Sequence, residues 1–336
     1  MKVDGAVSLD PVQAGDSARA AEASGYDGAW CPETGHDPFV SLTLAAEHTE
    51  RIELGTSIAV AFARNPMTTA VTANDLQLLS QGRFILGLGS QIKPHIEKRF
   101  SMPWSHPAPR MREFIGALRA IWDCWNNGTP LEFRGEFYRH TLMTPFFNPG
   151  PNRHGAPKVF LAGVGTYMTE VAGEMADGFL CHGFTTERYL REVTIPALER
   201  GRATAGRSMD GYEIAGPIFI VTGETEADVN TADGLVRNQI AFYGSTPAYR
   251  QVLELHGWGD LQTELNTLSK QGRWAEMATL IDDDIVNTFA VVGEPDEIAA
   301  ELVRRYGDVI TRVSFYMPGV GDPARWSDIV EALQAA

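Results

Sequence analysis

Cysteine is scarce in this sequence. The 336 residues contain three cysteines, Cys31, Cys124 and Cys181, which are widely spaced and form no CxxC pair. An odd number of separated cysteines does not provide the disulfide framework of a small secreted protein. We therefore expect a protein of the reducing cytoplasm.

Long basic runs and long apolar runs are also missing. Lys and Arg number 28 against 43 Asp and Glu, so the formal net charge is −15 at pH 7. An acidic chain without a basic patch is a poor partner for nucleic acid or for an anionic membrane surface. No stretch of about 18 apolar residues could cross a membrane, and the first residues, MKVDGAVSLDP, lack the apolar segment of a signal peptide. We expect the partners of this protein to be small molecules.

Common nucleotide and metal motifs are absent as well. Neither a Walker A sequence nor HExxH occurs. The glycine pairs in 87–92 (GLGSQI) and 163–168 (GVGTYM) do not extend to GxGxxG, because the third glycine is replaced in both. A dinucleotide site of the Rossmann type is therefore disfavoured.

What the sequence does contain is a regular alternation of short apolar runs with longer amphipathic stretches. Hydrophobic residues make up 44% of the chain, enough for one large domain or two ordinary ones. The apolar runs predict strands at 3–9, 26–32, 52–60, 84–89, 158–162, 178–181, 213–221 and 310–317. The other stretches predict helices at 11–24, 38–49, 66–80, 110–125, 168–176, 186–205 and 296–306, two or three more within 224–271, and one at the C-terminus, with Asp37 and Asn65 as N-caps.

Eight strands that alternate with helices predict a (β/α)8 TIM barrel of the α/β class. A doubly wound sheet is the main alternative. We expect one barrel domain over residues 1–336, with an insertion after the fourth strand at about 126–157 and another between the seventh and eighth strands at about 240–290. Active sites of such barrels lie at the carboxyl ends of the strands. The residues that follow each apolar run are therefore the candidate site.

The segment after the fifth predicted strand has the pattern of an anion site. Gly163, Val164, Gly165 and Thr166 stand at the start of a helix, where free backbone N–H groups and the helix dipole favour a phosphate. The alternative is a tight turn that simply needs glycine.

Histidines follow several of the predicted strands. His36 lies between Glu33 and Asp37 after the second strand, and could act as a general acid or base near neutral pH. It could equally be an exposed loop histidine beside an N-cap aspartate. His182 follows the sixth strand, where it could line the site as a cofactor-binding residue or be a buried structural histidine.

Six segments resemble one known family. They are 20–30 (AAEASGYDGAW), 51–58 (RIELGTSI), 64–66 (RNP), 79–90 (LSQGRFILGLGS), 176–179 (ADGF) and 292–298 (VGEPDEI). In this order they resemble the bacterial-luciferase-like flavin and deazaflavin oxidoreductases, and within them the branch that uses coenzyme F420. The resemblance covers nearly the whole chain.

This resemblance implies a cofactor site. It implies a cis peptide bond between Ser57 and Ile58, in a bulge that contacts the back of the deazaflavin ring. It also implies a phosphate site at Gly163, Val164, Gly165 and Thr166, contacts along the ring edge from Gly89, Ser90 and Gln91, and a functional histidine at His36. The usual order of Asp and His is reversed here, so either His36 or Asp37 faces the ring. Ile92 stands where sugar-phosphate-oxidising relatives carry an acid, so that activity is disfavoured.

The function that the resemblance implies is hydride transfer between coenzyme F420 and a substrate, with His36 moving a proton and Glu33 or Asp37 orienting it. Aromatic residues on the predicted loops, Phe62, Trp104, Phe146 and Phe147, suggest a small, apolar organic substrate. A two-component monooxygenase that uses FMN is the first alternative, and a cofactor-binding protein without catalysis is the second. Relatives commonly form dimers through the barrel helices, so we expect a homodimer.

Overall fold

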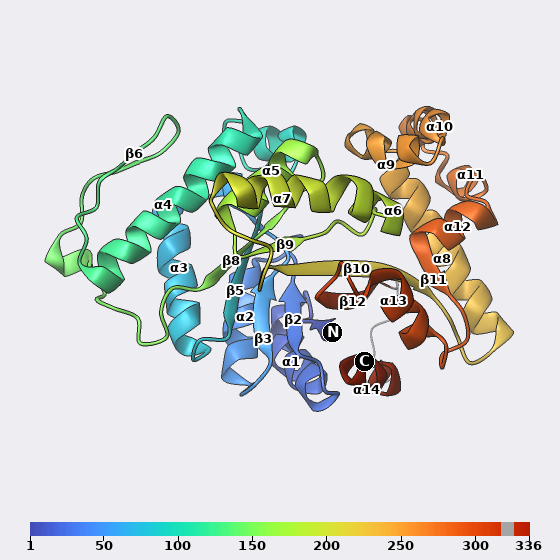
Figure 1. Cartoon of the computed structure of the whole chain (residues 1–336), viewed down its shortest axis with the longest axis horizontal. Coiled ribbons are helices and arrows are strands. Elements are labelled where there is room, and N and C mark those ends of the chain that lie inside the picture. The colour runs from blue at the N-terminus through green and yellow to red at the C-terminus, as the bar shows by residue number, and fades with distance from the viewer. Residues whose placement is uncertain (317–325) are drawn as a thin grey trace. The chain divides into compact units, whose positions relative to one another are not determined.

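The structure, a computed structural model, describes residues 1–316 and 326–336 (Figure 1). It divides into two compact units. Unit 1 comprises Met1–Asp4, Cys181–Pro196 and Glu213–Ala336, and unit 2 comprises Gly5–Leu180 and Ala197–Tyr212.

Unit 2 contains a parallel sheet whose strands follow the order of the chain. Neighbouring strands pair as β2 with β3, β3 with β5, β5 with β8 and β8 with β9. The strands are β2 (Gly28–Cys31), β3 (Glu53–Thr56), β4 (Ala59–Val60), β5 (Phe84–Gly89), β8 (Lys158–Ala162) and β9 (Gly178–Leu180). The helices are α1 (Ala14–Ala23), α2 (Pro38–Glu47), α3 (Pro66–Leu79), α4 (Pro107–Asn127), α5 (Thr166–Met175) and α7 (Ile195–Thr204).

Two helices of unit 2 begin at the predicted N-caps. The Asp37 side chain accepts a hydrogen bond from the Phe39 N–H at the start of α2. The Asn65 side chain accepts from the Thr68 N–H at the start of α3. Each helix has proline at its first position, where the missing N–H costs no hydrogen bond. Both predicted caps are confirmed.

The predicted insertion after the fourth strand contains a small hairpin. Strand β6 (Phe133–Arg134) pairs antiparallel with β7 (Arg139–His140). In Figure 1 this segment extends as a long loop beyond α4. This hairpin lies within residues 131–140 (LEFRGEFYRH), whose glycine is at the turn.

Unit 1 joins the first strand of the chain to the last one. Strand β1 (Lys2–Ala6) pairs in parallel with β12 (Arg312–Tyr316), and β12 pairs in parallel with β10 (Glu213–Val221). Short β11 (Ala290–Val292) pairs with β10 on its other side. The helices are α6 (Glu187–Tyr189), α8 (Glu226–Gly244), α9 (Arg250–Leu255), α10 (Gly259–Lys270), α11 (Trp274–Ala278), α12 (Asp283–Phe289), α13 (Ile298–Tyr306) and α14 (Ser327–Ala335).

The fold is the predicted (β/α)8 barrel. A doubly wound sheet reverses its strand order partway, whereas the strands of unit 2 run in chain order and β1 pairs with β12. In the described part of the chain, no helix has the length and apolar character needed to span a membrane.

Some predicted element boundaries were wrong. The single helix expected at 186–205 is divided into α6, a π-helical turn at Leu190–Thr194 and α7. Pro196 has no N–H to donate to the preceding turn, which is a sufficient cause for the wider turn. Strand β11 was not predicted, because three apolar residues between helices give no periodicity. Residue Met317 of the eighth predicted strand lies outside the described residues.

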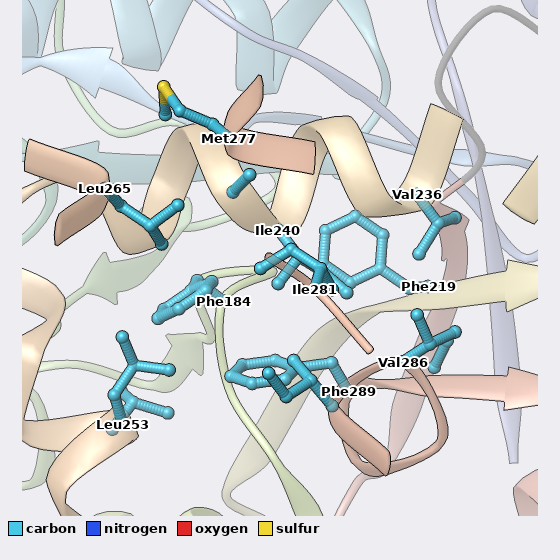
Figure 2. Close-up of a cluster of buried hydrophobic side chains, with 14 of the residues drawn as sticks. Phe184, Phe219, Val236, Ile240, Leu253, Leu265, Met277, Ile281, Val286 and Phe289 are labelled. Atoms are coloured by element: carbon cyan, nitrogen blue, oxygen red, sulfur yellow. The ribbon is translucent and has the colours of Figure 1, made fainter. Parts of the chain in front are cut away.

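The helices between β10 and β11 enclose an apolar cluster of their own. Figure 2 shows Phe184, Phe219, Ile240 and Phe289 directed into this cluster. Phe184 stacks on Phe289 with 4.6 Å between ring centroids. This packing fixes the position of Phe184, which follows β9 in the chain, against Phe289.

Candidate functional site

The Ser57–Ile58 peptide bond is cis, as the resemblance implied. The strand predicted at 52–60 is interrupted at this bond and becomes β3 and β4. A Cβ atom on Gly89 would lie 2.8 Å from Cγ1 of Ile58, and one on Gly87 would lie 1.8 Å from the carbonyl oxygen of Thr56. These two glycines therefore allow the segment that contains the cis bond to lie directly against β5.

Ser90 and Gln91 follow β5 and form local hydrogen bonds. The Ser90 hydroxyl donates to the Gln91 carbonyl oxygen over 3.1 Å, and the Gln91 side-chain oxygen accepts from the Ile92 N–H over 3.0 Å. Gln91 has a φ of 59°, in the left-handed region. Both side chains thus end the strand in a defined turn. Their contact with a cofactor stays a prediction.

The predicted phosphate loop lies at the N-terminus of α5. Gly165 is the N-cap residue, no side chain caps this end, and the first turn contains no acidic residue. The N–H groups of the first helical turn have no acceptor within a helix. A Cβ atom on Gly165 would meet nothing within 4 Å. The loop is therefore open to a ligand, and its donors and dipole suit an anion.

Glu33 and Asp37 are brought together by an arginine. Arg64 Nη1 lies 2.5 Å from Glu33 Oε2, and Arg64 Nη2 lies 2.9 Å from Asp37 Oδ2. Glu33 also accepts from the Val60 N–H over 2.7 Å, and its side chain is 7% exposed. The two carboxylates thus hold the loop between β2 and α2 against the start of α3. Arg64 was not predicted as a site residue, although the segment RNP contains it.

His36 lies exposed on the loop that these ion pairs hold. The next residue, Asp37, is engaged both as the cap of α2 and as a partner of Arg64. Arg99 donates to the carbonyl oxygen of Thr34 in the same loop. His36 is therefore presented on a loop anchored at several points. Its role in proton transfer, and its orientation by Glu33 or Asp37, stay predictions.

His182 belongs to unit 1, where it contacts two tyrosines. Its Nδ1 accepts from the Phe184 N–H over 3.0 Å, and its Nε2 lies 3.0 Å from the Tyr249 hydroxyl. The ring centroids of Tyr249 and Tyr243 lie 4.5 and 4.7 Å from that of His182. Burial lowers the pKa of His182 to about 4, so the ring is neutral at pH 7. As a cofactor ligand it stays a prediction.

The lowered pKa of His182 predicts a pH-dependent stability. Between the ordinary histidine pKa of 6.5 and about 4, the unfolded state binds this proton and the folded state does not. Stability contributed by the neutral ring is therefore complete above pH 6.5 and falls by up to about 3 kcal/mol as the pH drops to about 4. Urea denaturation at pH 7.5 and 4.5 tests this. In His182→Asn, which keeps an acceptor for the Phe184 N–H, the loss between the two pH values should be about 2.5 kcal/mol smaller. Equal losses in the two proteins contradict the assignment.

Three tyrosines, two that contact His182 and one that is bonded to Tyr243, were not predicted. Tyr243 is in α8, Tyr249 follows it in the chain, and Tyr316 ends β12. The hydroxyl oxygens of Tyr243 and Tyr316 lie 2.6 Å apart. Tyr249 is 67 residues from His182, and Tyr316 is 73 residues from Tyr243. Because the partners are so far apart in the chain, no local pattern in the sequence indicated these contacts. Tyr316 is the last described residue of β12, on the carboxyl side of the strand, which is the side where a barrel carries its site.

The aromatic loop residues expected to suggest a substrate have different environments. Phe62 is buried and forms an edge contact with Trp104 at 5.5 Å. Phe146 and Phe147 are 89% and 73% exposed. Phe62 and Trp104 thus have a packing role. We assign no role to the exposed rings of Phe146 and Phe147.

A polar cavity of about 450 Å³ in unit 1 contains none of the predicted site residues. Its arginines already have partners: Arg191 contacts Asp308 at 2.7 Å, Arg304 contacts Glu301 at 2.6 Å and Arg188 contacts Glu192 at 2.9 Å. Paired charges of both signs leave little net attraction for an ionic ligand. Within residues 1–316 and 326–336, no three His, Cys, Asp or Glu side chains gather as a metal site.

Comparisons with known proteins match nearly the whole chain. The family model for luciferase-like monooxygenases matches residues 4–312. The uncharacterized protein Rv1360 of Mycobacterium tuberculosis is 56% identical over 313 residues, which are 93% of this chain and 92% of that protein. An F420-dependent glucose-6-phosphate dehydrogenase of the same species is 31% identical over 209 residues, 58% of this chain and 60% of that enzyme.

A solved structure agrees with the fold. The coenzyme F420-dependent tetrahydromethanopterin reductase from Methanopyrus kandleri superposes with a TM-score of 0.79. The two sequences are 22% identical, and the superposition covers 98% of this chain and 96% of that one.

Proposed function

Because the chain belongs to the luciferase-like monooxygenase family, we propose that it is a coenzyme F420-dependent oxidoreductase that acts on a small, apolar organic substrate. Relatives named as F420-dependent enzymes support this choice of cofactor. The proposal leaves the identity of the substrate open.

The observation that carries this proposal is the open N-terminus of α5. Its free N–H donors, the absence of a side-chain cap and the space around Gly165 fit the phosphate of a cofactor. We assign Gly163, Val164, Gly165 and Thr166 to that phosphate. Gly89, Ser90 and Gln91 after β5, together with Ser57 and Ile58, are assigned to the ring.

A bound deazaflavin would supply hydride transfer, a two-electron chemistry that the side chains cannot perform. The chain would contribute binding, exclusion of water and a proton. His36 is the proposed proton donor, because it is an exposed histidine on a loop that Arg64 holds through Glu33 and Asp37. In this assignment both carboxylates fix the loop, and Asp37 also caps α2.

The experiment that tests the proposal is a titration of the purified protein with F420 and with FMN, followed by quenching of cofactor fluorescence. We expect the Kd for F420 to be at least about tenfold lower than that for FMN, which corresponds to about 1.4 kcal/mol. Tighter binding of FMN favours the monooxygenase alternative and rejects the proposal. Absence of binding by either compound rejects both.

His36→Asn tests the proton donor. Menadione, an uncharged organic acceptor, is the probe, and its reduction to menadiol would need a hydride from reduced F420 and a proton from the protein. Loss of a general acid is expected to lower the rate at saturating cofactor by about 100-fold. Stopped-flow absorbance of F420 gives the rate, and the Kd for F420 should remain within about twofold of the wild-type value. An unchanged rate removes His36 from the mechanism.

A further inference from the structure

We propose that the hydroxyl groups of Tyr249 and of the Tyr243–Tyr316 pair bind the oxygen atom of an uncharged organic substrate, such as the carbonyl oxygen of an aldehyde or ketone. This inference rests on the proposed function, and it supplies the substrate class that the proposed function leaves open.

The first part of this site is the hydroxyl group of Tyr249. His182 Nδ1 accepts from the Phe184 N–H, so the single proton of the neutral ring is on Nε2. Nε2 therefore donates to the Tyr249 oxygen, 3.0 Å away. The hydroxyl proton of Tyr249 is not used in this bond. Tyr249 consequently has a donor to offer, for which the described residues provide no acceptor.

The second part is the pair formed by Tyr243 and Tyr316. Two hydroxyl groups 2.6 Å apart share one hydrogen bond, in which one is the donor and the other the acceptor. The accepting hydroxyl retains its own proton. The pair thus offers one further donor, whichever tyrosine provides it. Together with Tyr249, the cluster has two O–H groups for an external acceptor.

Aromatic packing holds the hydroxyl groups in place. Phe219 stacks on Tyr316 with 4.8 Å between the ring centroids, and the ring centroids of Phe184 and Tyr249 are 5.7 Å apart. Figure 2 shows Phe184 and Phe219 anchored in the apolar cluster of unit 1. A Cβ atom on Gly183 would lie 3.0 Å from the Tyr316 ring, so the chain also lies close to that ring. Donors fixed before binding lose less entropy when a ligand arrives.

The cluster is suited to an uncharged oxygen. His182 is neutral because burial lowers its pKa, and burial raises the pKa of Tyr249 to about 12. The three tyrosines are thus protonated donors at neutral pH, and their rings form apolar walls. A carboxylate or phosphate bound here would lose hydration without gaining a cation from the cluster. A carbonyl oxygen needs only the two hydroxyl donors.

The test measures binding of three small probes without any cofactor. Benzaldehyde has an uncharged carbonyl oxygen, styrene has nearly the same shape without oxygen, and benzoate carries a charge. Saturation-transfer NMR titrations give a Kd for each. We expect the ratio of the styrene Kd to the benzaldehyde Kd to fall about fivefold in Tyr249→Phe, which loses one hydroxyl donor and keeps the ring.

Variants of the tyrosine pair sharpen the test. Tyr243→Phe and Tyr316→Phe each leave one hydroxyl with one proton, so either single variant should keep the wild-type ratio. The double variant has no donor left and should lower the ratio about fivefold. Tyr306→Phe is the matched control, because the Tyr306 hydroxyl is buried in unit 1 without a hydrogen-bond partner among the described residues. Its ratio should equal that of the wild type.

Three results would each overturn the inference. The first is a ratio of the styrene Kd to the benzaldehyde Kd that stays within about twofold of the wild-type ratio in Tyr249→Phe or in the double variant. The second is no binding of benzaldehyde to the wild-type protein, and the third is tighter binding of benzoate than of benzaldehyde. Because no cofactor is present, the result is independent of the F420 titration. Failure of F420 to bind rejects the proposed function, whereas failure of the probe ratios rejects only this substrate class.

Discussion

Replacement of Arg312 by Met is expected to lower the free energy of unfolding by about 3–5 kcal/mol. The Arg312 side chain is 0% exposed, and its guanidinium contacts Asp4 at 2.7 Å and Glu213 at 2.9 Å. The variant leaves the buried carboxylate of Asp4 without this cation. The buried charge that loses this cation, rather than the lost attraction alone, accounts for the size of the effect.

Urea denaturation measures this loss, with Arg304→Met as the matched control. Arg304 is 67% exposed and pairs with Glu301, so its loss should cost less than about 1 kcal/mol. The double variant Arg312→Met/Asp4→Leu removes both charges and should recover more than half of the loss. Equal destabilisation by Arg312→Met and Arg304→Met would show that the buried ion pair is unimportant.

Gly165→Asp is expected to weaken F420 binding by at least about 100-fold. A carboxylate at the N-cap of α5 occupies the helix end and repels a phosphate, and about 3 kcal/mol of repulsion corresponds to this factor. The fold should tolerate the side chain, since a Cβ atom there meets nothing within 4 Å. Fluorescence titration gives the Kd.

Two controls separate charge from shape in this experiment. Gly165→Ala adds only a methyl group and should bind F420 within about threefold of the wild type. The deazaflavin without its phosphate chain should bind the wild type and Gly165→Asp equally, because it has no group to repel. Normal F420 binding by Gly165→Asp would show that the phosphate lies elsewhere.

Much of the fold could be predicted because its signals are local. The run Phe84–Gly89 is buried at every position, and its predicted bounds agree with β5. Asp37 and Asn65 bond to N–H groups two and three residues ahead, so their capping roles depend on neighbouring residues alone. The helix expected at 186–205 was wrong in detail because a proline changed the turn before it.

The candidate site was predicted in part. The loop at Gly163–Thr166 and the cis bond at Ser57–Ile58 lie where the motifs placed them. The joint contact of Glu33 and Asp37 with Arg64 was not foreseen, because charge patterns do not reveal which carboxylate an arginine will meet across about 30 residues.

The sequence by itself determined the alternation of strands and helices, the family and the glycines at the start of α5. These are properties of short segments, which periodicity and motif spacing record directly. Tertiary structure alone decided that Arg312 meets Asp4 across 308 residues and that Tyr249 meets His182 across 67. Such contacts form because packing of the strands and of the apolar cluster brings distant residues together, and nothing in the local sequence specifies the partner.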